Sequence, residues 1–280
     1  MSIPLGKPDP REAQIQNYIS FIADLCHTDK DIISLIYEYL LQEFRNPFYT
    51  IEFLIIRSID IRLANMALKT DDSVLNIGCG RPIAEVVFDS WGIKKIVGID
   101  IDPENIQRGR KWLDDLGITT VELYQGDALS LDFPGESFDV VCSFSAIEHV
   151  KGWTSYEKWI ENMSKLTRRE AVLTTSNKKN LPLYLLGQLV RMEGYEHFFT
   201  RRQIEGLLSR HDLKVTYFDT NTLWFSDYIP VGHLGKRVII KNYEYALKFD
   251  LLLEKLRKNI LKSYGGRMGF IAHKIEESSQ

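Results

Sequence analysis

The chain has 280 residues, 44% apolar and 26% charged, an ordinary globular composition that excludes a disordered chain. Its 35 Lys and Arg against 38 Asp and Glu give a net charge of −3, which argues against a strong polyanion binder. The acidic excess lies in residues 1–150, with 13 basic and 24 acidic side chains, whereas residues 151–280 carry 22 and 14. We expect two solvated faces, the alternative being a basic flank for an anionic substrate or a membrane surface.

The cysteines and the chain's apolar stretches indicate a compartment. Cys26, Cys79 and Cys142 are far apart and form no C-x-x-C pair, so a disulfide framework is excluded and a reducing compartment is expected. The N-terminus has no apolar signal core, and the longest strongly apolar stretch, residues 181–190, is too short to span a bilayer. The histidines show no metal-ligand spacing, so no metal site is expected. The sequence predicts a soluble cytoplasmic protein, with contact at the membrane surface as an alternative.

Residues 1–70 are predicted to form a helical N-terminal cap. Apolar side chains recur at helical spacing over residues 15–25 and again over residues 32–40. Asn46-Pro47 interrupts the pattern, and a third helix is predicted from residue 49 to about residue 68. Arg57 and Arg62 in this third helix are expected to be solvated or salt-bridged, the alternative being that one of them reaches the carboxylate of a ligand.

Beyond residue 71, short apolar runs alternate with amphipathic helices. Strands are predicted at residues 73–77, 95–99, 121–124, 138–143 and 171–175, and helices at residues 82–91, 103–116 and 156–166. After residue 178 the pattern loosens, with helices at residues 181–192, 200–210 and 243–261 and strands at residues 214–218 and 267–273. The alternation predicts an α/β, Rossmann-like, doubly wound and mainly parallel sheet over residues 71–280. Insertions are expected at about residues 178–199 and 221–264, on either side of the sixth strand.

A glycine turn, Gly78-Cys79-Gly80, follows the first of these strands and precedes a helix. Glycine suits this place because a Cβ would keep a ligand from the backbone, and the helix N-terminus offers unpaired N–H groups. The second strand ends at Asp100, twenty residues after Gly80, where a carboxylate can accept both hydroxyls of a ribose. A dinucleotide turn would need Gly or Ala at position 83, so Ile83 argues against a nicotinamide enzyme.

The next two strand ends also carry polar side chains. Asp127 and Ala128 follow the third strand, and an acidic side chain there can accept a hydrogen bond from an adenine amine. The fourth strand leads into residues 143–150, which include Glu148 and His149. Since the carboxyl ends of strands converge on one crevice in a doubly wound sheet, we expect these residues to share a site.

This set of residues resembles the class I S-adenosylmethionine-dependent methyltransferases over roughly residues 71–175. Glu148-His149-Val150 is similar to a signature of the small-molecule branch that contains ubiquinone- and menaquinone-biosynthesis methyltransferases. Residues 196–204 are similar to a family segment that precedes the last crossover helix. The resemblance implies a seven-stranded sheet with an antiparallel last strand, S-adenosylmethionine as the cofactor, and methyl transfer to a small-molecule or lipid-like acceptor.

The resemblance also implies roles for single residues around the cofactor. Gly78, Cys79 and Gly80 would pass under its methionine part, Asp100 would hold the ribose, Ile101 would lie against the adenine face, Asp127 would meet the adenine amine with Ala128 beside it, and Ser143 and Phe144 would line the methionine side. Glu148 and His149 would face the transferred methyl group or the acceptor. His149 and His197 are candidate bases, because histidine titrates near neutral pH.

Two positions depart from the family pattern. Asn76 stands where the family usually has an acidic residue, so it can accept a hydrogen bond but lacks the charge that would pair with the cofactor's ammonium group. Pro82 replaces a third glycine that is often seen in the turn, and proline suits the first position of a helix.

Two alternatives to a small-molecule methyltransferase remain open at this point. A catalytically silent member of the fold would act as a scaffold for a partner. A nucleic-acid methyltransferase could use the basic second half of the chain. No nucleic acid is expected, however, because no added RNA-binding module is present and Ser143-Phe144-Ser145-Ala146 stands where amino-methylating enzymes carry Asn/Asp-Pro-Pro-Tyr. Residues 181–190 are expected to be core or lid, with contact to lipid as the alternative.

Overall fold

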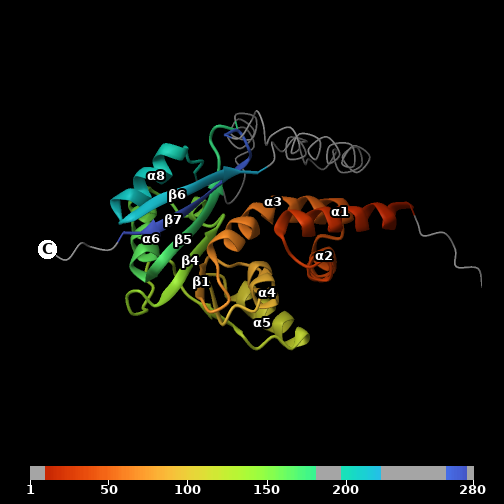
Figure 1. The fold of residues 1–280 in the computed structure, drawn as a ribbon. Coiled ribbons are helices and arrows are strands. Elements are labelled where there is room, and N and C mark those ends of the chain that lie inside the picture. The colour runs from red at the N-terminus through yellow and green to blue at the C-terminus, as the bar shows by residue number, and fades with distance from the viewer. Residues whose placement is uncertain (1–9, 181–196, 222–262, 276–280) are drawn as a thin grey trace, which may run out of the picture.

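The computed structural model describes residues 10–180, 197–221 and 263–275 (Figure 1). Its N-terminal helices are α1 (Pro10–Cys26), α2 (Lys30–Phe44) and α3 (Pro47–Ala67). Its strands are β1 (Ser73–Ile77), β2 (Lys95–Asp100), β3 (Val121–Gln125), β4 (Phe138–Phe144), β5 (Thr167–Ser176), β6 (Leu213–Thr220) and β7 (Arg267–Lys274). The helices among the strands are α4 (Ile83–Ser90), α5 (Pro103–Leu116), α6 (Trp153–Leu166) and α8 (Arg201–Arg210), with a short 3-10 helix, η1 (Ile147–His149).

The described strands form one seven-stranded sheet in the order β3-β2-β1-β4-β5-β7-β6. Strands β1 to β5 are parallel to one another, whereas β7 runs antiparallel to both β5 and β6. The strand order reverses between β1 and β4, and a ligand crevice is expected at the carboxyl ends on either side of such a reversal. The predicted Rossmann-like, mainly parallel sheet with an antiparallel last strand is confirmed.

Helices cover both faces of this sheet, which explains why the central strands are apolar throughout. One apolar cluster joins the N-terminal helices, α4 and α5 to one face, and a second cluster joins α6 and α8 to the other. In β4, six of the seven residues are buried, as expected of a strand with helices on both sides. No described helix combines the length and the apolar character needed to cross a bilayer.

Helix α3 belongs to the layer that covers the sheet as well as to the N-terminal helices. It packs against β4, β5 and β7, and Figure 1 shows it leading from α1 and α2 to the sheet. Ile59 and Leu63 are buried there, and a Cβ on Gly269 would lie 2.2 Å from Leu63 Cδ1. The approach of helix to strand is therefore close, and the helical segment before residue 70 does not stand apart from the core.

Several predicted helix starts are confirmed by their capping groups. Asp102 Oδ1 accepts from the backbone N–H of Glu104 at 2.8 Å and caps α5. Thr200 and Gln203 form a reciprocal capping box at the start of α8. Pro82 differs from its prediction, because it is the N-cap residue of α4 and the first helical position belongs to Ile83.

Strand β5 begins four residues earlier than predicted. The start of the strand was not predicted because the two charged residues Arg168 and Arg169 are typical of a loop. In the fold, Arg168 pairs with Asp139 at 2.6 Å and Arg169 pairs with Asp72 at 2.7 Å. These partners lie far away in sequence, so the local pattern did not reveal the strand. The predicted helices at residues 181–192 and 243–261 lie outside the described residues.

Replacing Ile59 with Ala tests whether α3 is integral to the core. The side chain is fully buried on the face toward β7, so we expect Ile59→Ala to lower the free energy of unfolding by about 2–5 kcal/mol. Urea unfolding followed by circular dichroism would measure this. Met66→Ala is the matched control on the same helix, since Met66 is 56% exposed. A first transition that melts the N-terminal helices and leaves the sheet intact would contradict the expectation.

Candidate functional site

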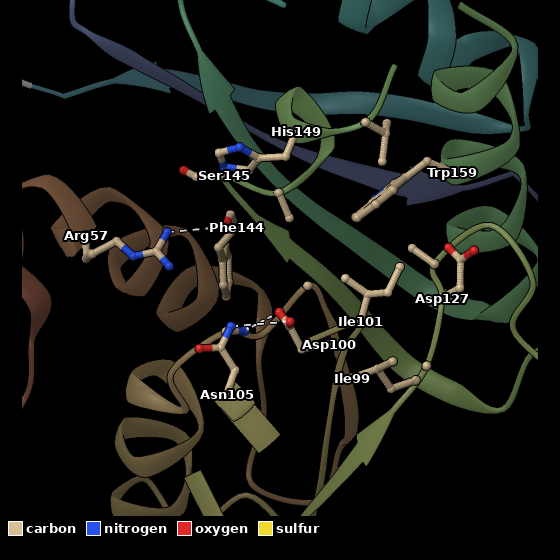
Figure 2. Close-up of a pocket in the computed structure, with 16 residues that line it drawn as sticks. Arg57, Ile99, Asp100, Ile101, Asn105, Asp127, Phe144, Ser145, His149 and Trp159 are labelled. Carbon is tan, nitrogen blue, oxygen red and sulfur yellow. Dashed lines mark hydrogen bonds between the residues drawn. The ribbon is translucent and has the colours of Figure 1, made fainter. Parts of the chain in front are cut away.

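A cavity of about 440 Å³ opens at the carboxyl ends of the central strands (Figure 2). Its walls come from α3, the glycine turn, β2 and the start of α5, the segment after β3, the segment after β4, and α6. The lining residues are Arg57, Gly78, Gly80, Ile99, Asp100, Ile101, Asn105, Gly126, Asp127, Ala128, Phe144, Ser145, Ala146, His149, Val150 and Trp159. This volume lies within the range of small-molecule sites.

The glycine turn forms the floor of the cavity. Gly78 and Gly80 have φ values of +74° and +53°, which side-chain-bearing residues rarely adopt. The backbone N–H groups of Gly78 and Cys79 both donate to Ile99 O, at 2.8 and 2.9 Å, and thereby tie the turn to β2. A Cβ on Gly78 would lie 2.4 Å from the Cβ of Ala146, so only glycine fits.

Asp100 is held in place by three donors. Its Oδ2 accepts from the backbone N–H of Gly80 at 2.8 Å. Its Oδ1 accepts from the backbone N–H of Asp102 at 2.9 Å and from Asn105 Nδ2 at 3.4 Å. A carboxylate has about four lone-pair sites, so Oδ2 keeps one for a ligand hydroxyl while the three protein donors fix the orientation of Asp100.

Two residues close the side of the cavity beyond Asp100. Ile101 is 67% exposed and offers an apolar surface at the rim. Asp127 is also exposed, and its Oδ1 accepts from the backbone N–H of Leu129 at 2.9 Å, which fixes the turn after β3. Figure 2 shows Ile101 and Asp127 on one side of the cavity and Arg57 on the other. A planar, amine-bearing ring would meet both an apolar and an acidic group here.

Arg57 brings a positive charge from α3 into the cavity wall. Its Nη1 donates to Phe144 O at 3.2 Å and pairs with Asp60 Oδ2 at 3.0 Å, so the predicted salt bridge is confirmed. Burial raises the pKa of Asp60, and the Arg57 guanidinium beside it opposes that shift. Asp60 Oδ1 also accepts from Thr174 Oγ1 at 2.6 Å, which links α3 to β5.

The segment after β4 contributes a conformationally strained residue. Ser145 is buried, lines the cavity and has a φ of +53°. Its backbone N–H donates to Thr174 O at 2.9 Å, and its Oγ lies 3.4 Å from Thr174 Oγ1. These contacts to β5 hold the strained turn that presents Ala146 and His149 to the cavity.

The structure brings eight of the thirteen predicted site residues to the cavity. They are Gly78, Gly80, Asp100, Ile101, Asp127, Ala128, Phe144 and His149. Asn76, Cys79, Ser143, Glu148 and His197 do not line it. The eight residues meet at the cavity because the carboxyl ends of the strands converge there. The other five lie elsewhere for different local reasons.

Three of these five side chains are buried beneath the cavity wall. Asn76 Nδ2 donates to Glu85 Oε1 at 2.8 Å. Ser143 Oγ accepts from Trp159 Nε1 at 3.2 Å, so it positions a residue that does line the cavity. Cys79 is buried, and burial raises the pKa of its thiol well above the ordinary value, which does not suit a nucleophile.

Glu148 and His197 also lie apart from the cavity, unlike the expectation that they face an acceptor or act as bases. Glu148 is fully buried, and its two oxygens accept from Thr175 Oγ1 at 3.0 Å and from Ser176 Oγ at 3.1 Å. His197 packs against the rings of Tyr156 and Phe199, and burial lowers the pKa of its imidazole. His149 is exposed and lines the cavity.

Eight of the sixteen lining residues were not among the predicted site residues, and Asn105, Trp159 and Arg57 are the most informative of them. Asn105 lies in the first turn of α5, five residues after Asp100, and that proximity was a usable signal. Trp159 follows Tyr156 by three residues on α6, which looked like ordinary core spacing. Arg57 carried no local signal toward the cavity, because its contact with Phe144 spans 87 residues.

Comparison with known proteins identifies the segment that forms most of these walls. Residues 75–175 match the family model described as methyltransferase domain. This segment is a methyltransferase domain. A fit is visible in the residues themselves, because the glycine turn leaves backbone exposed to a ligand and the acidic and amide groups of Asp100 and Asn105 suit a nucleoside.

The relatives of the domain are methyltransferases named for different compounds. The chain is 42% identical over 84 residues to the aklanonic acid methyltransferase DauC of a Streptomyces species, covering 28% of this chain and 37% of that one. It is 37% identical over 77 residues to the ubiquinone biosynthesis O-methyltransferase of Azorhizobium caulinodans, covering 28% and 30%. It thus spans less than half the length of the curated relatives it matches.

Among solved structures, the fold resembles that of a SAM-dependent methyltransferase from Methanosarcina mazei. The TM-score is 0.54 at 19% identity, and the match covers 77% of this chain and 98% of the other. At this identity the likeness concerns the fold alone. It extends beyond the domain segment and supports the strand order and helix layers described above.

Removal of the Asp100 carboxylate tests the assignment of the ribose site. We expect Asp100→Ala to weaken binding of S-adenosylhomocysteine by about 1–3 kcal/mol, since hydrogen bonds to a charged group would be lost. Isothermal titration calorimetry would measure the change. Asp102→Ala is the control, because Asp102 caps α5 but does not line the cavity. An unchanged affinity in Asp100→Ala would refute the assignment.

Proposed function

We propose that this chain transfers a methyl group from S-adenosylmethionine to a small-molecule or lipid-like acceptor. The observation that carries the proposal is the gathering of the glycine turn, the fixed Asp100 carboxylate, Asp127 and Arg57 around one cavity of about 440 Å³. The turn leaves room for a ligand against its backbone, and Asp100 can accept from a hydroxyl. Asp127 can accept from an amine, and Arg57 can pair with a carboxylate. All four features would suit different parts of one ligand. The methyltransferase domain match over residues 75–175 supports the same reading.

In this proposal each wall of the cavity holds one part of the cofactor. Asp100 and Asn105 hold the ribose, while Ile101 and Asp127 meet the adenine. The methionine part lies over Gly78 and Gly80. Arg57 pairs with its carboxylate, because the guanidinium is the cation that α3 supplies to the wall.

The bound cofactor supplies a methyl group on a sulfonium, whose departure leaves a neutral sulfide. Because the leaving group is good, most of the rate enhancement can come from holding the acceptor in line with the methyl group. Phe144, Val150 and Trp159 give this part of the cavity apolar walls and exclude water. A base is needed only where the acceptor must lose a proton, and His149 is the histidine that lines the cavity.

The class of acceptor is inferred from the walls and from the relatives. The apolar groups at the rim favour an organic molecule with an apolar body over a highly charged polymer. The two relatives named above carry the names of small organic molecules, aklanonic acid and ubiquinone. The matches cover only 37% and 30% of those relatives, so the acceptor class is inferred mainly from the chemistry of the cavity.

Calorimetric titration with four adenosine-containing ligands tests the proposal. We expect S-adenosylmethionine and S-adenosylhomocysteine to bind at micromolar concentration and NADH not to bind. 5′-Methylthioadenosine should bind more weakly, because it has no carboxylate to meet Arg57. Binding of NADH alone would overturn the proposal, and silence from all four would favour a scaffold that has lost its cofactor.

His149→Ala tests the catalytic side of the cavity. Release of S-adenosylhomocysteine would be followed in the presence of apolar phenols and lipids as candidate acceptors. With an acceptor that must lose a proton, turnover should fall by about 100-fold, the usual contribution of a general base. The affinity for S-adenosylhomocysteine should stay nearly the same. Equal losses of turnover and affinity would show instead that His149 only supports the structure.

A further inference from the structure

A buried acid lies beneath the glycine turn, next to Asn76. Glu85 is on α4 and is fully buried, and its Oε1 accepts from Asn76 Nδ2 at 2.8 Å. Asn76 is itself 2% exposed and is followed directly by Ile77 and the turn. The amide that replaces the acidic residue expected at position 76 is thus in contact with an acid from the following helix.

The sheet leaves a space for this carboxylate. In the β1–β2 register Asn76 is the partner of Gly98. A Cβ on Gly98 would lie 3.1 Å from Glu85 Oε1 and 3.1 Å from Cys79 Sγ. The acid therefore rests over a glycine of β2, beside the middle residue of the turn that floors the cavity.

The carboxylate is poorly satisfied within its surroundings. In the part of the chain that the structure describes, neither Glu85 Oε2 nor Asn76 Oδ1 has a hydrogen-bond partner. An ionised carboxylate in such a place is costly, because the Asn76 amide and the backbone N–H of Glu85 itself do not replace its hydration. Burial accordingly raises the pKa of Glu85 to about 7, although the Asn76 hydrogen bond opposes the shift.

The charged groups that face Glu85 include two residues of the cavity wall. Arg57 on α3 favours its ionised form, and Asp100 at the end of β2 disfavours it. The thiols of Cys79 in the turn and Cys142 on β4 also feel its charge. Glu85 is therefore coupled to charges that line the cavity, and a cation that enters the cavity will act on it in turn.

We propose that Glu85 supplies, from beneath the glycine turn, the negative charge that Asn76 lacks toward the cationic end of S-adenosylmethionine. The inference rests on the proposed function, which places a sulfonium and an ammonium over that turn. Glu85 is a positioning residue, since it lies outside the cavity wall and acts through Asn76 and through its field. In the free protein the ionised form of Glu85 is poorly stabilised, and a bound cation stabilises it.

Linkage gives the direction of the pH effect. A bound cation stabilises the ionised form of Glu85, so deprotonation of Glu85 strengthens binding by the same factor. At pH 6 most free molecules carry a proton on Glu85, and binding must expel it; at pH 8 few do. If the cation lowers the pKa by about one unit, affinity rises about fivefold from pH 6 to pH 8.

The first experiment is calorimetric titration of the wild-type chain with S-adenosylmethionine at pH 6, 7 and 8. At pH 7, comparison of phosphate with Tris buffer should give release of about 0.4 protons per bound ligand under the same assumption. 5′-Methylthioadenosine, which has neither sulfonium nor ammonium, should bind with less than a twofold change over this range. This comparison needs no variant, so it holds even where a substitution unfolds the chain.

Two variants distinguish the effect of Glu85 from that of other ionisable groups around the cavity. Glu85→Gln keeps the size and the hydrogen bond to Asn76, and it should weaken S-adenosylmethionine at pH 8 about tenfold, abolish most of the proton release and spare 5′-methylthioadenosine. Combining Glu85→Gln with Asn76→Asp transfers the negative charge to the residue that is hydrogen-bonded to position 85. This double variant should restore the affinity for S-adenosylmethionine. A role limited to packing would not be rescued in this way.

The outcomes distinguish this inference from the proposed function. Binding of neither S-adenosylmethionine nor 5′-methylthioadenosine by the wild-type chain would defeat both. Binding of both ligands with equal pH dependence, or a Glu85→Gln variant that weakens them equally, would overturn the role of Glu85 alone. The role of Glu85 would be established if Glu85→Gln weakened S-adenosylmethionine selectively and the double variant with Asn76→Asp restored its affinity.

Discussion

The site depends on one steric constraint, which is that the chain turns after β1 in a space that admits no Cβ at its first residue. Gly78 touches Ala146 from the segment after β4 and is hydrogen-bonded to Ile99 on β2. One turn thus fixes the ends of three neighbouring strands relative to one another. The backbone N–H of Gly80 in the same turn orients Asp100. The turn therefore fixes the position of the nucleoside side of the cavity relative to its methyl side.

The strand ends could be predicted from the sequence because they follow from topology and local pattern. Parallel strands that alternate with helices bring their carboxyl ends together whatever the long-range details, and the caps at Asp102 and Thr200 depend only on nearby residues. What could not be predicted was the direction of single side chains at those ends. Asn76 and Ser143 were expected in the cavity, but their side chains are hydrogen-bonded beneath its wall, to Glu85 and Trp159. Arg57 was equally hidden, since no local pattern reports a contact across 87 residues.

Buried acids surround this cavity, and their neighbours satisfy them to different degrees. Asp60 has a guanidinium and a hydroxyl, and Glu148 has two hydroxyls. Glu85 has the Asn76 amide and its own backbone N–H, and its Oε2 has no hydrogen-bond partner among the described residues. A set of carboxylates under a ligand site produces a negative potential within it, which suits a ligand that carries positive charge until it reacts. The electrostatic character of the fold thus resides largely in groups that no ligand touches.

Helix α3 has one further consequence for how such a chain can vary. One side of it seals the sheet at β7, and Arg57 on the same helix reaches the cavity wall. Two requirements, core packing and a positive charge at the cavity, therefore constrain its sequence within about two turns of helix. The helices before it, α1 and α2, pack on α3 and α2 also on α4, but neither contributes a residue to the cavity lining. Their sequences can therefore change without altering the cavity wall, whereas a change in α3 alters the core and the wall together.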